Sequence, residues 1–176
     1  QTTIFPQNIE GDLSGKIHIY IPFDLRNGVL MSGLDSKIDL TLENGRLIKV
    51  KSLNDLSKSF NTTAGKVLFG KKNIKYIQTE LNDLRFSKLN NTILIKNSKV
   101  RIPPMKISSS FLDMTIGGVH DFENNIDYRF SFKFKDLLKH KNQDEFGEII
   151  DDPTGIVLFI RMKGTLENPI IEWDKD

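Results

Sequence analysis

The chain has 176 residues, a length typical of a single domain, and its positive and negative side chains are interspersed with a net charge of +2. So small an excess of positive charge argues against nucleic-acid binding. The absence of cysteine excludes disulfide bonds and thiolate metal sites.

The composition favours strands over helices. Alanine, the best helix former, occurs once, whereas β-branched and aromatic residues are abundant. The longest unbroken apolar run, Ile156–Ile160, is far shorter than the ~20 residues that span a membrane. Gln1 opens a polar start without a signal-peptide pattern, so we expect a mature or excised fragment of a larger protein.

The first strand is predicted over Lys16–Ile21. Isoleucine alternates there with polar side chains, and Pro22 ends the pattern. The preceding residues 1–14 contain Pro6 and Gly11, and we expect them to be an irregular lead-in.

A hairpin is predicted next. Ser36–Leu42 alternates apolar and polar residues, and Arg46–Val50 follows directly after Asn44-Gly45. Asn-Gly between two such runs is the strongest short-range hairpin signal, so we expect the two runs to pair with each other.

The middle of the chain changes to helical spacing. A capping signal at Ser52 precedes a predicted helix over Leu53–Phe60. A loop over Asn61–Gly65 and a brief strand over Lys66–Gly70 are expected to follow. Ile74–Leu89 fits both a helix and a strand, and both alternatives stay open.

A dense β pattern begins after Asn91. Thr92–Ile95 and Lys99–Ile102 are predicted to pair around a turn at Asn97-Ser98. Pro103-Pro104 is expected to break the ladder, because proline has no amide donor.

A long antiparallel hairpin is predicted for Phe111–His120 against Ile126–Lys135, with Glu123–Asn125 as its turn. Apolar residues change parity before this hairpin, which predicts a bulge or bend near Ser110–Phe111.

The second strand of this hairpin carries the strongest pattern in the chain. Its apolar face consists of Ile126, Tyr128, Phe130, Phe132 and Phe134, and the residues between them are polar or charged. A helix would scatter these side chains around its axis. Burial of this face contributes on the order of 10 kcal/mol, so something apolar must cover it.

The C-terminal part is predicted to contain a short helix near Asp144–Ile150. Ile156–Lys163 is nearly continuous in apolar residues at first and predicts a strand buried on both faces. Ile170–Trp173 is expected to form a short edge strand. Residues 1–176 thus predict a single, mainly β module: a long, antiparallel, twisted or curled sheet, forming a groove or a partly open barrel, with two or three short helices.

Few residues suggest chemistry. His18, His120 and His140 lack metal-ligand spacing, and Ser108–Ser110 lacks the glycines of a nucleophile elbow. The acidic cluster over Asp144–Asp152 lacks the oxygen spacing of a calcium loop. The sequence therefore predicts no catalytic residue, no metal, no cofactor and no enzymatic activity.

Several runs, in their order and spacing, resemble the C-terminal region of bacterial AsmA-like proteins, over residues 36–173. The matching runs are Glu43–Leu47, Leu84–Leu89, Ile93–Ile102, Ile102–Ser110, Gly118–Phe122, Ile126–Tyr128, Gly164-Thr165 and Asn168-Pro169.

This resemblance implies a periplasmic module of a Gram-negative envelope protein that is anchored in the inner membrane. AsmA-like proteins build long β-sheets curled into an apolar groove, and they are implicated in phospholipid transport between membranes and in outer-membrane biogenesis. The implied partners are phospholipid acyl chains and other envelope proteins, with no nucleic acid. Membrane contact is expected through parts of the protein outside this chain.

Two interpretations of the aromatic face stay open. Its side chains either line a trough for acyl chains or form a closed β core beneath the helices. The candidate lining residues are Leu112, Met114, Ile116, Tyr128, Phe130, Phe132 and Phe134. The corresponding functions are lipid handling, or a structural docking module that caps the long sheet and binds another envelope protein.

Overall fold

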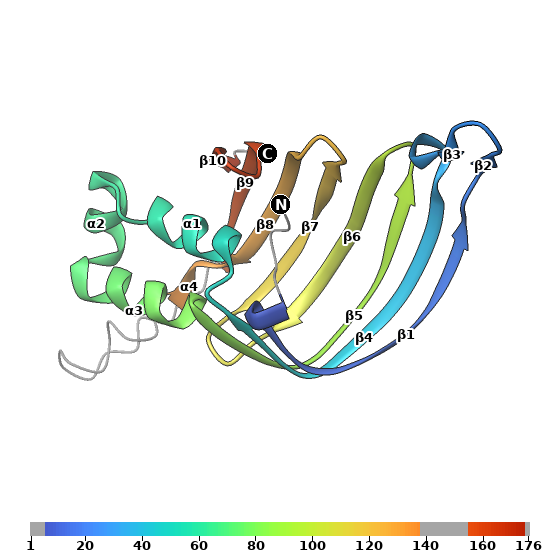
Figure 1. Cartoon of the computed structure of the whole chain (residues 1–176). Helices are drawn as coiled ribbons and strands as arrows, with labels where there is room; N and C mark the ends of the chain where they lie inside the picture. Colours follow the sequence, from blue (N-terminus) through green and yellow to red (C-terminus); the bar gives the residue numbers. More distant parts are fainter. Residues whose placement is uncertain (1–5, 138–154, 175–176) are drawn as a thin grey trace.

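The computed structural model describes residues 6–137 and 155–174. They form an eight-stranded antiparallel sheet in the order β1-β4-β5-β6-β7-β8-β9-β10, together with a separate two-stranded hairpin, β2–β3. The sheet is curled but open, and β1 and β10 are its two free edges (Figure 1). The mainly β fold class predicted from the sequence is therefore confirmed.

The elements follow one another with short connections. The strands of the main sheet are β1 (Ile9–Tyr20), β4 (Asp35–Ile48), β5 (Asp83–Lys96), β6 (Lys99–Ser108), β7 (Asp113–Asp121), β8 (Asn125–Lys133), β9 (Val157–Thr165) and β10 (Pro169–Asp174). The helices are α1 (Lys51–Ser59), α2 (Thr63–Phe69), α3 (Lys71–Leu81) and the single turn α4 (Phe134–Leu137). The remaining elements are β2 (Phe23–Asp24), β3 (Gly28–Val29) and the 3₁₀ turns η1 (Pro6–Asn8) and η2 (Met31–Gly33).

The main sheet has one apolar and one polar face, because side chains alternate between the faces along each strand. The register places Ile17 beside Ile38 and Ile38 beside Ile93 on the apolar side. On the same side, Met114 lies beside Phe132, in the buried core. We call this apolar side the inner face and the opposite side the outer face.

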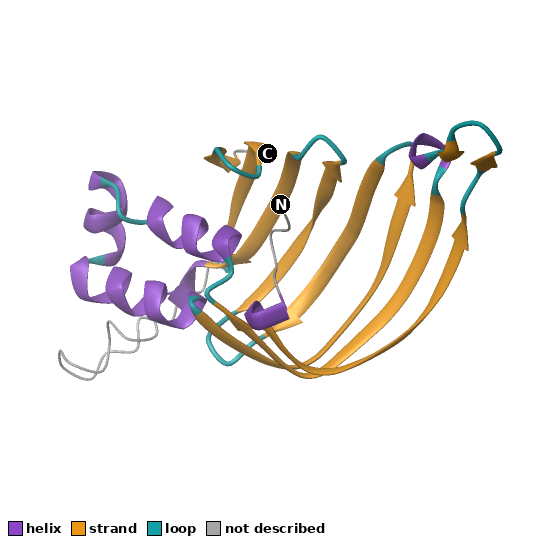
Figure 2. Cartoon of the chain, in the orientation of Figure 1, coloured by secondary structure: helices purple, strands orange, loops and turns teal. Residues whose placement is uncertain are grey.

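Helices α1–α3, inserted between β4 and β5, cover one end of the inner face (Figure 2). Phe60, directly after α1, is only 1% exposed. The centroid of its ring lies 5.5 Å from that of Phe69, 6.1 Å from that of Phe132 and 5.8 Å from that of Trp173. This aromatic cluster joins the helices to β8 and β10.

The predicted hairpin at Asn44-Gly45 is wrong, because β4 runs through both residues. β4 pairs with β1 on one side and with β5 on the other, so a turn there would interrupt two ladders. Asn44 has a positive φ of 52°, and the register between β1 and β4 shifts beside it. The tolerance of Asn-Gly for positive φ therefore serves a β-bulge and not a turn.

The helical region is longer than expected. The helix over Leu53–Phe60 is confirmed as α1, but the expected loop and the strand at Lys66–Gly70 are wrong, because most of that segment forms α2. The Thr62 side chain accepts a hydrogen bond from the Gly65 N–H and so caps α2. Both alternatives for Ile74–Leu89 are present: the segment contains the end of helix α3 followed by the start of strand β5.

The turn at Asn97-Ser98 is confirmed, and both residues have positive φ. The expected break of the ladder at Pro103-Pro104 is confirmed on the side of β5, where pairing with β6 ends at the pair of Leu94 and Arg101, and only an isolated bridge joins Phe86 to Ser109 beyond β6. The strand itself continues, because β6 runs through both prolines and keeps pairing with β7 after a register shift. Prolines that offer no amide donor explain why β5 and β6 separate there.

The long hairpin is confirmed as β7 paired with β8. Of the expected bulge or bend near Ser110–Phe111, the bend is confirmed: both residues bend in the connection between β6 and β7, where the Ser109 N–H donates to the Leu112 carbonyl. Phe134 does not extend the aromatic strand: β8 ends at Lys133, and Phe134 begins α4 with its ring 5.5 Å from Phe69.

The terminal strands also differ from expectation. β1 begins at Ile9, so the first 14 residues are not all an irregular lead-in. β9 is not buried on both faces, because Val157 is 41% and Phe159 is 43% exposed on the outer face. The edge strand near the C-terminus is confirmed as β10. The helix expected near Asp144–Ile150 lies outside the described residues.

Candidate functional site: the inner face of the sheet

The predicted lining residues lie together, but mostly inside the closed core. Five of them are 9% exposed or less: Leu112, Met114, Tyr128, Phe130 and Phe132. Ile116 is half-buried beside Phe130, and Phe134 is half-buried on α4. In this structure the end of the inner face under the helices is therefore filled by the protein's own side chains.

The inner face is open in the other half of the sheet, over β1, β4, β5 and β6. Three of its side chains on β1 are strongly exposed: Leu13 (71%), Ile17 (67%) and Ile19 (56%). The neighbouring strands continue the same rows with half-buried aliphatic side chains. We call the following set the open face: Leu13, Ile17, Ile19, Ile38, Leu40, Ile93, Ile95, Val100 and Ile102.

The polar groups on these rows are already hydrogen-bonded. The Ser36 hydroxyl, between Ile19 and Ile95, donates to the His18 carbonyl at 3.0 Å. Asn91, between Leu40 and β6, donates to the Pro103 carbonyl at 3.3 Å and accepts from the Thr92 N–H at 2.7 Å. Within the described rows, a ligand bound to the open face would therefore make aliphatic contacts and hardly any polar ones.

The outer face of the same strands is charged. Lys37 lies 3.2 Å from Asp39, Lys88 lies 2.9 Å from Glu43, and Lys96 pairs with Asp35 at 2.9 Å. A hydrogen bond from the Thr92 hydroxyl, helped by Lys37, holds the pKa of the Asp39 carboxyl below its usual value. The outer face of these strands is thus mainly polar, with Tyr20 and Leu94 as exposed apolar exceptions, whereas the inner face carries rows of aliphatic side chains.

A partly buried polar pair lies between the open face and the closed core. His120 Nδ1 lies 2.8 Å from the hydroxyl of Tyr128, which is diagonal to it because Tyr128 pairs with Gly118. Burial raises the pKa of Tyr128 to about 12, and burial lowers the pKa of His120 against the opposing effect of Asp121. Both effects favour the neutral forms near pH 7, so the pair adds no charge to the inner face.

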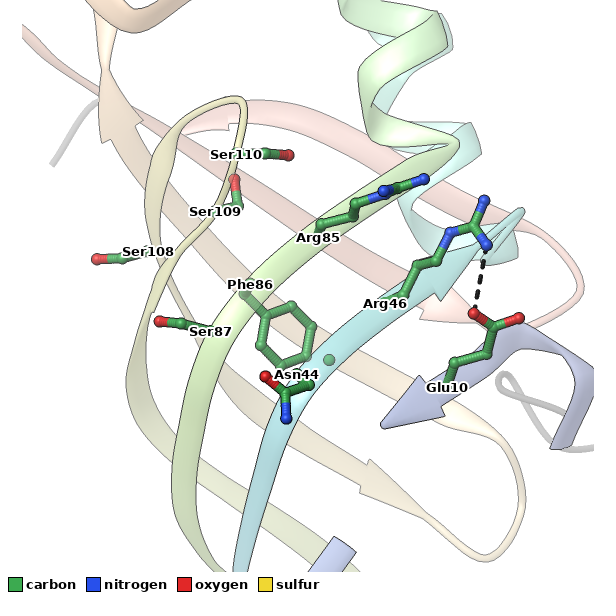
Figure 3. Close-up of a pocket in the computed structure, with 10 residues that line it drawn as sticks. Glu10, Asn44, Arg46, Arg85, Phe86, Ser87, Ser108, Ser109 and Ser110 are labelled. Atoms are coloured by element: carbon green, nitrogen blue, oxygen red, sulfur yellow. Dashed lines mark hydrogen bonds and ion pairs between the residues drawn. The ribbon is translucent and has the colours of Figure 1, made fainter. Parts of the chain in front are cut away.

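A polar cavity of about 620 Å³ lies where β5 and β6 separate (Figure 3). Two arginines line it, and both contact Asp83. Arg46 binds both carboxylate oxygens of Asp83 at 2.6 and 2.8 Å and contacts Glu10 at 3.3 Å, and Arg85 lies 3.6 Å from Asp83. The Ser109 hydroxyl in its wall donates to the Leu112 carbonyl and so holds the turn between β6 and β7. These contacts of Arg46 and Ser109 hold neighbouring strands and the turn together.

Metal and membrane-spanning features are not found within the described ranges. No group of three or more His, Asp or Glu side chains there is arranged to hold a metal ion. No helix there has both the length and the apolar character needed to cross a bilayer. His140 lies outside the described residues.

Comparison with known proteins found no matching family model, no matching curated protein and no matching solved structure. The resemblance to AsmA-like proteins therefore stays a prediction from the sequence.

Sequence reasoning located the aromatic strand but missed the open face. The signal was present, since Ile17 and Ile19 alternate in the predicted first strand and Ile38 and Leu40 alternate in the next. Alternation shows that one side of a strand is apolar, but it does not show whether another layer covers that side. The helices cover β8 and leave β1 bare, and that choice is made only in three dimensions.

Proposed function

We propose that this chain is a non-enzymatic lipid-handling module whose open face holds acyl chains. The observation that carries the proposal is an apolar face whose side chains are exposed on β1 and half-buried on β4, β5 and β6, while the outer face of the same strands carries several ion pairs. Exposed apolar surface of this extent on a soluble domain marks a binding surface. The AsmA-like resemblance supports a periplasmic role in phospholipid transport and outer-membrane biogenesis.

The dimensions of the open face suit an acyl chain. From Leu13 to Ile19 the strand extends about 20 Å, at ~3.4 Å per residue. One leaflet of a bilayer holds its acyl chains within ~15 Å, half of the hydrocarbon thickness. Each methylene removed from water contributes about 0.8 kcal/mol, so aliphatic contacts alone can hold such a chain.

The test compares two substitutions on one strand. Ile17→Glu places a charge on the open face, whereas His18→Glu places the same charge on the outer face one residue away. Both positions lie on the exposed edge strand β1, so both variants are expected to fold. We expect Ile17→Glu to weaken the binding of a soluble fluorescent fatty acid at least tenfold, and His18→Glu to leave it unchanged, by fluorescence titration.

Lipid extracted from the purified protein gives an independent measurement. Mass spectrometry of an organic extract should find phospholipid in the wild type and less in Ile17→Glu. Equal binding by both glutamate variants, or a wild type that binds no fatty acid and carries no lipid, would refute lipid handling by the open face.

The second candidate is a structural docking module that binds another envelope protein. The free edge of β1 favours it, because all 12 residues of this strand are exposed and only one of its sides is paired. Such an edge is a template for a further strand. A lipid-free protein in which substitutions along β1 abolish binding to a protein partner would favour this candidate.

A further inference from the structure

The hairpin between β1 and β4 carries a concentration of exposed apolar side chains. We call residues 22–31, which include β2 and β3, the hairpin tip. The exposed fractions are 65% for Phe23, 95% for Leu25, 51% for Val29, 39% for Leu30 and 52% for Met31. The tip lies at the end of β4 opposite the helices (Figure 1).

The tip is held in shape by local hydrogen bonds. The Asp24 carboxylate accepts from the backbone N–H groups of Arg26 at 2.7 Å and Asn27 at 2.9 Å. These donors hold the pKa of Asp24 below its usual value, so the charged carboxylate stays bound within the turn. The Leu30 N–H donates to the Pro22 carbonyl and closes the base of the hairpin. The apolar side chains are therefore presented by an ordered turn.

The tip follows the open face directly along the chain. Exposed apolar side chains recur at alternate positions from the end of β1 into the tip, although β1 ends at Tyr20 and β2–β3 forms a separate sheet. They are Ile17 (67%), Ile19 (56%), Ile21 (48%), Phe23 (65%) and Leu25 (95%). None of these alternate positions between Ile17 and Leu25 carries a charged side chain.

The size and charge of the tip favour a membrane over a protein partner. A stable protein interface uses roughly 20–30 residues on each side, whereas the tip offers ten. Its two charged residues are Asp24, which is bound within the turn, and Arg26, which is exposed. An exposed cation among apolar side chains matches the anionic headgroups above a hydrocarbon layer.

We propose that the hairpin tip inserts into the interfacial layer of a phospholipid bilayer and gives acyl chains access to the open face. The second half of this statement rests on the proposed function; the membrane contact itself does not.

A single fluorescent label tests the contact. The chain has no cysteine, so Leu25→Cys provides a unique site for an environment-sensitive NBD group. The matched control is Val67→Cys, an 80% exposed position on α2. With vesicles of phosphatidylethanolamine and phosphatidylglycerol, we expect the NBD emission to rise severalfold at position 25 and to stay constant at position 67. An unchanged signal at position 25 would overturn the proposal.

A substitution in the unlabelled chain tests the membrane contact separately from lipid handling by the open face. Leu25→Glu should lower the vesicle-bound fraction in sedimentation roughly tenfold, while soluble fatty-acid binding stays unchanged. Vesicle binding without fatty-acid binding would retain the membrane contact and refute the proposed function. Unaltered vesicle binding by Leu25→Glu, or a dimer that this variant dissociates, would overturn the membrane contact.

Discussion

Single carboxylates tie neighbouring strands together on this sheet. Asp83 on β5 binds Arg46 on β4 through two oxygens, and Asp127 on β8 binds Arg161 on β9 in the same way at 2.8 and 2.7 Å. Arg46 holds the pKa of Asp83 at about 2, and Arg161 holds the pKa of Asp127 below its usual value. These carboxyl groups are partly exposed, so water screens each pair and limits its stabilising effect.

Asp83 predicts an acid-dependent loss of stability. Its folded pKa of about 2 lies below the ~3.9 of an unfolded chain, so its contribution is present above that unfolded value and is lost as the pH falls towards 2. We expect Asp83→Asn to unfold at lower urea concentration than the wild type at pH 6, and the difference to shrink between about pH 4 and pH 2. A constant difference across this window would show that the carboxylate does not act through its charge.

The second residue-scale prediction concerns Phe60. Its ring is fully buried against two other phenylalanines and Trp173, the single tryptophan of the chain. Phe60→Ala should cost about 3–5 kcal/mol of stability and should change the emission of Trp173. Val67→Ala, at an exposed position on the neighbouring helix, is the control and should change neither the denaturation midpoint nor the emission. Similar behaviour of the two variants would mean that the ring cluster does not join the helices to the sheet.

At the scale of elements, the bulge in β4 is the feature that most shapes the sheet. A Cβ at Gly45 would overlap the ring of Phe86 on the paired strand, so the packing of this ring over β4 requires glycine. Asn44 supplies the positive φ beside it. The bulge lets β4 stay paired with both β1 and β5 where the sheet curls.

Gly45→Ala tests this requirement. We expect it to cost about 1–3 kcal/mol by overpacking, measured by urea denaturation. Phe86→Leu on top of Gly45→Ala should recover part of the loss, because a smaller side chain relieves the overlap. Strictly additive effects of the two substitutions would indicate that the ring and the added methyl group do not meet.

The whole molecule combines a closed end and an open end. Under the helices, aromatic side chains from β8 are buried at the level of a protein core. Away from them, the inner face is exposed on β1 and half-buried on β4, β5 and β6, and β1 adds an unpaired edge. Stability and binding are thereby separated along one sheet: the closed end holds the fold, and the open end is available to a guest.

Hydrogen exchange should reveal this division. Amides of β8, in the interior of the sheet, should exchange most slowly, and those of the edge strand β1 much faster, because an edge strand opens without disturbing the core. Added fatty acid should slow exchange in β1 and β4 more than in β8. Equal slowing across all strands would indicate binding that does not involve the open face.

Features of the fold that depend on residues close together in the sequence could be predicted, and features that depend on distant residues could not. Local patterns predicted four features correctly. Alternation of apolar and polar residues predicted the mainly β class and the aromatic face of β8, turn residues predicted the turn at Asn97-Ser98, and a capping signal predicted helix α1. The Asn44-Gly45 hairpin failed because the same local signal suits a bulge, and the choice depends on β1 pairing from over 20 residues away. Likewise, α2 depends on partners such as Phe60 and Phe134 more than on its own spacing.

The candidate site divides in the same way. The sequence by itself determined that the strands have one apolar and one polar side, because a period of two leaves no other arrangement. Only the tertiary structure decided that Phe130 and Phe132 are covered while Ile17 and Ile19 are exposed. The physical reason is that coverage depends on where the inserted helices settle, and three short helices suffice for one end of the inner face but not for both.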